Sequence, residues 1–84
     1  MNANNKKIIK KVSELIEIHD DMYDTYVGSK ELQEKIDLMR KDLILHHEII
    51  LLSDKYTREQ KEIILETIDI NEKFIAIVKK AFDY

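Results

Sequence analysis

Apolar residues recur along this chain at alternating spacings of three and four, the heptad pattern of helices that pack against one another. The pattern predicts three helices, over residues of about 6–27, 30–53 and 58–83. We call the row of heptad positions that should face the other helices the seam. The seam of the first helix consists of Ile8, Val12, Leu15, His19, Met22 and Tyr26. The seam of the second consists of Leu32, Ile36, Met39, Leu43, His46 and Ile50, and that of the third of Ile64, Ile68, Asn71, Ile75, Val78 and Phe82.

The breaks between the three segments carry residues that end or begin helices. Gly28 suits the left-handed conformation that ends many helices, and Ser29 can cap the next one. Thr57 followed by Gln60 matches a capping box, although the break over residues 53–57 is otherwise less marked. Short connections place sequential helices antiparallel. We therefore expect one domain over residues 1–84, an all-α antiparallel three-helix bundle with coiled-coil-like packing.

The order of charges along the helices favours this arrangement. The first helix begins with lysines and then turns acidic, which opposes its own dipole, and its acidic residues are Glu14, Glu17, Asp20, Asp21 and Asp24. The third helix has the reverse order, with acids early and Lys79 and Lys80 late. In the expected bundle these two helices run parallel, so their charges complement each other along their length.

Composition narrows the classes of function. The chain has 84 residues, no Pro, no Cys and one Gly, so disulfides and thiolate metal sites are excluded. A net charge of −3 disfavours a nucleic-acid partner. The longest strongly apolar stretch, residues 43–52, is too short and too polar to span a membrane, and the N-terminus lacks the apolar core of a signal peptide. We expect a cytoplasmic protein that binds neither nucleic acid nor membrane.

Three polar residues, His19, His46 and Asn71, occupy seam positions. Polar residues at such positions fix helix register, and a buried neutral imidazole would also make the bundle sensitive to acid. Asp42 and His46 could supply two metal ligands, but the inward carboxylates of di-iron bundles are missing. No catalytic motif is recognisable. We therefore expect no metal, no cofactor and no enzymatic activity.

Excess hydrophobicity is the strongest functional signal in the sequence. A bundle helix needs about three apolar positions in seven, and the second half of the second helix is apolar nearly all round. The residues beyond its seam are Leu38, Ile44, Leu45, Leu51 and Leu52, and the third helix adds Ile63, Ile70 and Ile77. Two other helices can cover only part of this surface. We expect a contiguous apolar patch to remain for a partner or for a second copy of the chain.

The second half of the chain resembles the flagellar export chaperone family that includes FliT and FlgN. The first matching stretch runs from Glu31-Leu32 to Arg40-Lys41-Asp42-Leu43-Ile44. The second runs from Thr57 to Lys61, through Ile64-Leu65-Glu66-Thr67-Ile68-Asp69-Ile70-Asn71, to Phe74-Ile75. The resemblance implies that the protein shields an export substrate by helix-to-helix contact. The binding positions it implies are Ile70, Phe74, Ile77 and Ala81.

Three hypotheses follow. The first is a chaperone- or adaptor-like module that binds a partner protein through an apolar helical face, with contact residues Ile44, Leu45, Leu51, Leu52, Ile70, Phe74 and Ile77. The second is a stoichiometric inhibitor, of the kind a phage or mobile element encodes, that docks the acidic face of the first helix on a basic protein. The third is a dimer in which the extra apolar face is consumed by symmetry.

Overall fold

The heptad-spaced segments all form helices. The computed structural model describes residues 3–52 and 57–82, which fold as α1 (Ala3–Thr25), α2 (Lys30–Leu52) and α3 (Arg58–Phe82). The helix α1 begins three residues before the predicted start and ends two residues before the predicted end, whereas α2 and α3 begin where the sequence predicts. The predicted last residues of the second and third helices, Ser53 and Asp83, lie outside the described residues.

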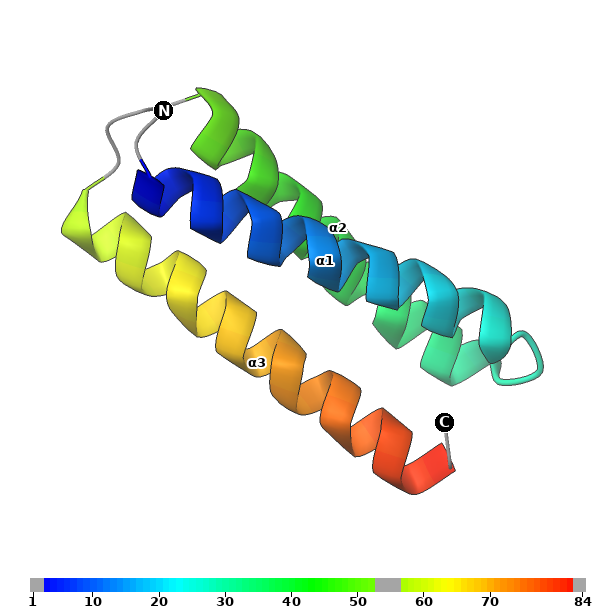
Figure 1. The fold of residues 1–84 in the computed structure, drawn as a ribbon. Helices are drawn as coiled ribbons and strands as arrows, with labels where there is room; N and C mark the ends of the chain where they lie inside the picture. Colours follow the sequence, from blue (N-terminus) through cyan, green and yellow to red (C-terminus); the bar gives the residue numbers. More distant parts are fainter. Residues whose placement is uncertain (1–2, 53–56, 83–84) are drawn as a thin grey trace.

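The three helices form an antiparallel bundle, as the sequence predicts. In Figure 1, α1 and α2 run side by side in opposite directions, and α3 returns along them parallel to α1. The bundle measures 41 × 19 × 18 Å, so it is one helix long and its length is about that of a helix of this size. The closest packing in the bundle is between α1 and α2, and α3 makes sparser contacts with both of them.

The core consists of residues from the predicted seams. The buried apolar side chains are Ile8, Val12, Leu15, Met22, Ile36, Leu43, Ile50, Ile64, Ile68, Ile75 and Val78, and His19 and Asn71 are buried among them. Burying each Leu, Ile, Val or Met side chain stabilises the fold by about 1.5–3 kcal/mol. Phe82 departs from the predicted seam because it lies in the last turn of α3. There its ring contacts that of Tyr26, at 5.3 Å between centroids, and it stays about half exposed.

The two connections differ in how well the sequence predicts them. Thr57 and Gln60 form the predicted capping box, with Gln60 N donating to Thr57 Oγ1 at 3.1 Å and Thr57 N donating to Gln60 Oε1 at 2.8 Å. The prediction for Gly28 is wrong, because its backbone is not in the left-handed region. A tight turn reverses the chain instead, in which Ser29 N donates to Tyr26 O at 3.0 Å. The Ser29 carbonyl then accepts the first hydrogen bond of α2, from Gln33 N.

An ion pair between Lys11 and Glu72 joins α1 to α3 at one point of the predicted charge complementarity, with 3.6 Å between Nζ and Oε2. Asp20 on α1 pairs with Arg40 on α2 instead. Lys73 on α3 pairs with Asp69 on its own helix, at 2.8 Å. Since these charges are largely exposed, each ion pair contributes little to stability.

Candidate partner-binding groove

An apolar groove of about 560 Å³ runs between α2 and α3. The apolar side chains that line it are Leu38 and Met39 from α2 and Ile70, Phe74 and Ile77 from α3. Its polar lining consists of Lys35, Asp42, Thr67, Asn71 and Lys73. Leu38 and Ile77 are about two thirds exposed, at 66% and 65%, so the groove presents apolar side chains directly to solvent.

Three of the predicted partner-binding residues, Ile70, Phe74 and Ile77, come together in this groove. They do so because spacings of three and four place residues on one flank of a helix, here the flank of α3 that faces α2. The sequence hypothesis left out Leu38 and Met39. Leu38 carries the signal that could have identified it, because it begins the heptad row that continues to Leu45 and Leu52.

Leu45 and Leu52 extend the apolar surface beyond the groove along α2. They follow Leu38 at intervals of seven and are 53% and 88% exposed. Ile49 shares this flank of the helix, and Ile63 occupies the corresponding row of α3, seven residues before Ile70. These side chains are all exposed, so helix spacing indicates an apolar strip that continues the groove towards the connection between α2 and α3.

Ile44 and Leu51 lie on a different flank of α2, next to α1. Their row on the helix includes Arg40, which pairs with Asp20 of α1, and His47, whose Nε2 lies 3.1 Å from Ser13 Oγ of α1. Ile44 is half-buried there, whereas Leu51 is 52% exposed. The predicted contact set therefore falls on two separate flanks, and the apolar groove lies on the α3 side.

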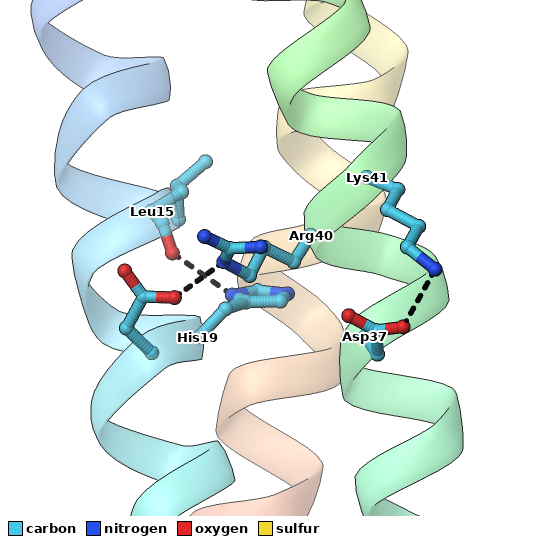
Figure 2. Close-up of polar contacts among 6 residues, drawn as sticks. Leu15, His19, Asp37, Arg40 and Lys41 are labelled. Carbon is cyan, nitrogen blue, oxygen red and sulfur yellow. Dashed lines mark hydrogen bonds and ion pairs between the residues drawn. The ribbon is translucent and has the colours of Figure 1, made fainter.

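His19 lies beneath the groove, with its ring 6.0 Å from that of Phe74, centroid to centroid. Its Nδ1 donates to the Leu15 carbonyl at 2.9 Å, as Figure 2 shows. Burial lowers the pKa of His19 below its ordinary value of 6.5, because the charged ring would lose its hydration. The bond to Leu15, the nearby side chain of Asn71 and the charge of Asp20 oppose this shift. His19 is therefore held as the neutral ring.

Nε2 of His19 and Oδ1 of Asn71 are buried at this level, where the two side chains are polar neighbours, and neither atom has another hydrogen-bond partner among the described residues. Asn71 Nδ2 is satisfied, because it donates to the Thr67 carbonyl at 2.8 Å. Buried polar atoms of this kind reduce stability and narrow the ways in which the helices can pack. Two of the three polar seam residues, His19 of α1 and Asn71 of α3, therefore lie at one level of the bundle.

His46, the third polar seam residue, is only half-buried. Its Nδ1 donates to the Asp42 carbonyl at 2.8 Å, and the carboxylate of Asp42 lies 3.6 Å from the same nitrogen. Among residues 3–52 and 57–82, no three His, Asp or Glu side chains come close enough to hold a metal ion. No helix in these same ranges combines the length and hydropathy needed to cross a lipid bilayer.

The acidic residues of α1 lie on the surface. Glu14, Glu17, Asp21 and Asp24 form one exposed row that faces away from the core. Asp20 lies to one side of this row and pairs with Arg40. Figure 2 shows Arg40 near the ion pair of Lys41 with Asp37 on α2. Arg40 therefore neutralises part of the acidic charge on the side that faces α2.

The fold and the groove together define an all-α three-helix bundle with an open apolar groove between its second and third helices. Comparison of the chain with protein-family models, with curated proteins and with solved structures found no match. The arguments for function therefore come from the groove itself.

Proposed function

We propose that this chain is a non-enzymatic protein–protein interaction module, chaperone- or adaptor-like, that binds an amphipathic helix of a partner protein in the groove between α2 and α3. The observation that carries the proposal is the groove itself, which is lined mainly by apolar side chains that the chain's own helices leave exposed. Soluble monomers seldom expose a contiguous apolar surface of this kind without a binding role.

The shape of the groove favours a helix as the bound element. Two antiparallel helices form its walls, and a further helix laid between them would complete a four-helix arrangement. Such a helix would present apolar residues at intervals of three and four to Leu38, Ile70 and Ile77. Lys35, Asp42 and Lys73 line the same groove and would pair with polar residues at the margins of the bound helix.

A pair of matched variants tests this function. Ile70 lines the groove and Leu51 lies on the α1 flank, yet both are 52% exposed and both lie within helices. Replacing either by Glu costs the fold a similar amount, whereas only Ile70→Glu places a charge in the groove. We expect Ile70→Glu to abolish partner binding and Leu51→Glu to preserve it.

The partner is captured from the native host with a photo-crosslinking amino acid at Leu38, and with the same group at Glu17 on the acidic face as a control. A supporting result is a partner that crosslinks from Leu38, fails to crosslink from Glu17 and is lost in the Ile70→Glu variant. A partner retained equally by the Ile70→Glu and Leu51→Glu variants would refute the groove as the binding site.

The exposed acidic row on α1 favours a second candidate, a stoichiometric inhibitor that docks on a basic protein surface. Two features of such a complex separate it from groove binding. It would crosslink from Glu17, and it would weaken steeply as salt is raised, because contacts between exposed charges are screened. Apolar docking in the groove lacks this steep salt dependence.

A further inference from the structure

Helix α3 carries a second apolar seam beside its core seam. The core seam consists of Ile64, Ile68, Asn71, Ile75 and Val78, all buried. The second seam alternates in steps of four and three and consists of Ile63, Thr67, Ile70, Phe74, Ile77 and Ala81. Four of these residues line the groove, and the other two continue the same heptad positions at its ends. The groove wall thus has the pattern of a coiled-coil contact surface that no helix of the chain covers.

A row of charges flanks this second seam. It consists of Glu59, Glu66, Lys73 and Lys80, which lie seven residues apart and are all exposed. Glu66, Lys73 and Lys80 directly precede the seam residues Thr67, Phe74 and Ala81, and Glu59 occupies the same heptad position one repeat earlier. This position borders the contact between two packed helices. Of the four, only Lys73 forms an ion pair with another described residue, which is Asp69 on the same helix. The sign of the row changes once, between Glu66 and Lys73.

This order of charges is complementary to itself when the helix is reversed. If two copies of α3 lie antiparallel, Glu59 of each meets Lys80 of the other, and Glu66 of each meets Lys73 of the other. The two-fold axis then passes close to Ile70, which is the central residue of α3, so the two helices overlap along their whole length. A parallel pair would set residues of the same number at the same level, so no Glu of the row would meet a Lys of the other copy.

We infer that a second copy of this chain covers the groove, with α3 against α3 antiparallel about a two-fold axis near Ile70. The contact is isologous, so each α3 lies between α2 and α3 of the other copy and four helices share the new apolar core. The apolar seam supplies the affinity. The charge row favours the antiparallel orientation, because that orientation brings each Glu of the row to a Lys of the other copy, although each exposed ion pair contributes little by itself.

The inference rests on the proposed function, because the same groove would receive the partner helix. A partner must then displace the second copy, so free protein is protected from unspecific apolar contact until the partner arrives. Partner binding becomes dependent on protein concentration, and a partner helix competes best when its own charge order matches that of α3.

Charge-reversal variants of the full chain test the inference. Analytical ultracentrifugation measures the mass of each variant in solution and therefore its self-association. Glu59→Lys/Glu66→Lys makes the row wholly basic, and Lys73→Glu/Lys80→Glu makes it wholly acidic, while the apolar seam stays intact. We expect the wild-type chain to be a dimer, each double variant to be at least tenfold weaker in self-association, and their equimolar mixture to recover dimer mass. The variant with all four changes reverses the order, stays self-complementary and should dimerise alone.

Circular dichroism of each variant verifies its folding, and the quadruple variant separates charge matching from any cost of substitution. The inference is overturned if the wild-type chain stays monomeric up to about 1 mM, a concentration at which even an association worth about 4 kcal/mol would be detected. It is also overturned if both double variants dimerise as tightly as wild type.

The two proposals fail in different ways. A monomeric wild-type chain that still captures a partner from Leu38, in a manner abolished by Ile70→Glu, would leave the proposed function standing without the dimer. If the charge variants behave as expected and Leu38 crosslinks only to a second copy of the chain, the dimer is supported and the partner-binding function is refuted.

Discussion

Lowering the pH should destabilise the bundle through His19. The ring is buried, and burial holds its pKa below the ordinary value of 6.5. In the unfolded chain the imidazole takes up a proton as the pH falls through about 6.5, whereas in the folded chain it does so only at lower pH. The stability that the neutral, buried ring contributes is therefore fully present above the unfolded pKa of about 6.5. That contribution is lost as the pH falls from the unfolded pKa to the folded pKa.

The size of the effect has an upper bound. Between about pH 7.5 and about pH 5.5, protonation of one imidazole in the unfolded state alone lowers the free energy of unfolding by at most about 1.4 kcal/mol. An 84-residue domain is stable by roughly 4–12 kcal/mol, so the loss is measurable. Urea unfolding followed by circular dichroism at both pH values gives the two free energies.

The variant His19→Leu isolates this contribution. Leu fills a similar volume in the core and cannot titrate, while His46 and His47 remain in both proteins. The difference between the two pH profiles therefore belongs to His19. Wild type should lose more stability than His19→Leu on acidification. Equal losses in the two proteins, or a larger loss in His19→Leu, would refute the reasoning that burial keeps this ring neutral.

Three further substitutions test the core and the two connections by chemical denaturation. Leu43→Ala should destabilise the fold by about 2–5 kcal/mol, because it leaves a cavity at a fully buried site, whereas Leu38→Ala at the exposed groove should cost much less. Gly28→Ala should stabilise the fold by about 0.4–1 kcal/mol, since its backbone is not left-handed and an added Cβ meets nothing within 4 Å. A loss of stability would mean that Gly28 is left-handed in solution. Thr57→Ala should cost about 1 kcal/mol through loss of the capping box, and an unchanged stability would show that α3 does not depend on this cap.

The sequence predicts most of this fold because apolar spacing and the absence of Pro act over whole helices. Most residues of the three seams become the core, and the capping box at Thr57 forms as its residues predict. Gly28 shows the limit of local signals. A glycine after a helix is compatible with several turns, and here the hydrogen bond from Ser29 N to Tyr26 O closes one that needs no left-handed residue.

The candidate groove was only partly predictable. Counting apolar positions identifies the helices with too many of them, and Ile70, Phe74 and Ile77 do lie together. Counting does not say which neighbour covers each flank, because that depends on how the three helices rotate about their own axes. The sequence therefore predicts one contact surface for Ile44, Leu51 and Leu45, although the row of Ile44 and Leu51 faces α1. Met39 was assigned to the core, although it also lines the groove.

The isoleucines of the second seam have no explanation within a single copy of the chain. Ile63, Ile70 and Ile77 are each more than half exposed, so they add little to the core. Ile is also a weaker helix former than Ala, Leu, Lys or Glu, because its branched Cβ loses side-chain freedom in a helix. Neither packing nor helix propensity within the monomer therefore favours Ile at these three positions. Burial against another helix would favour Ile there, and in the dimer that we propose the charges beside the seam would set the direction of that helix.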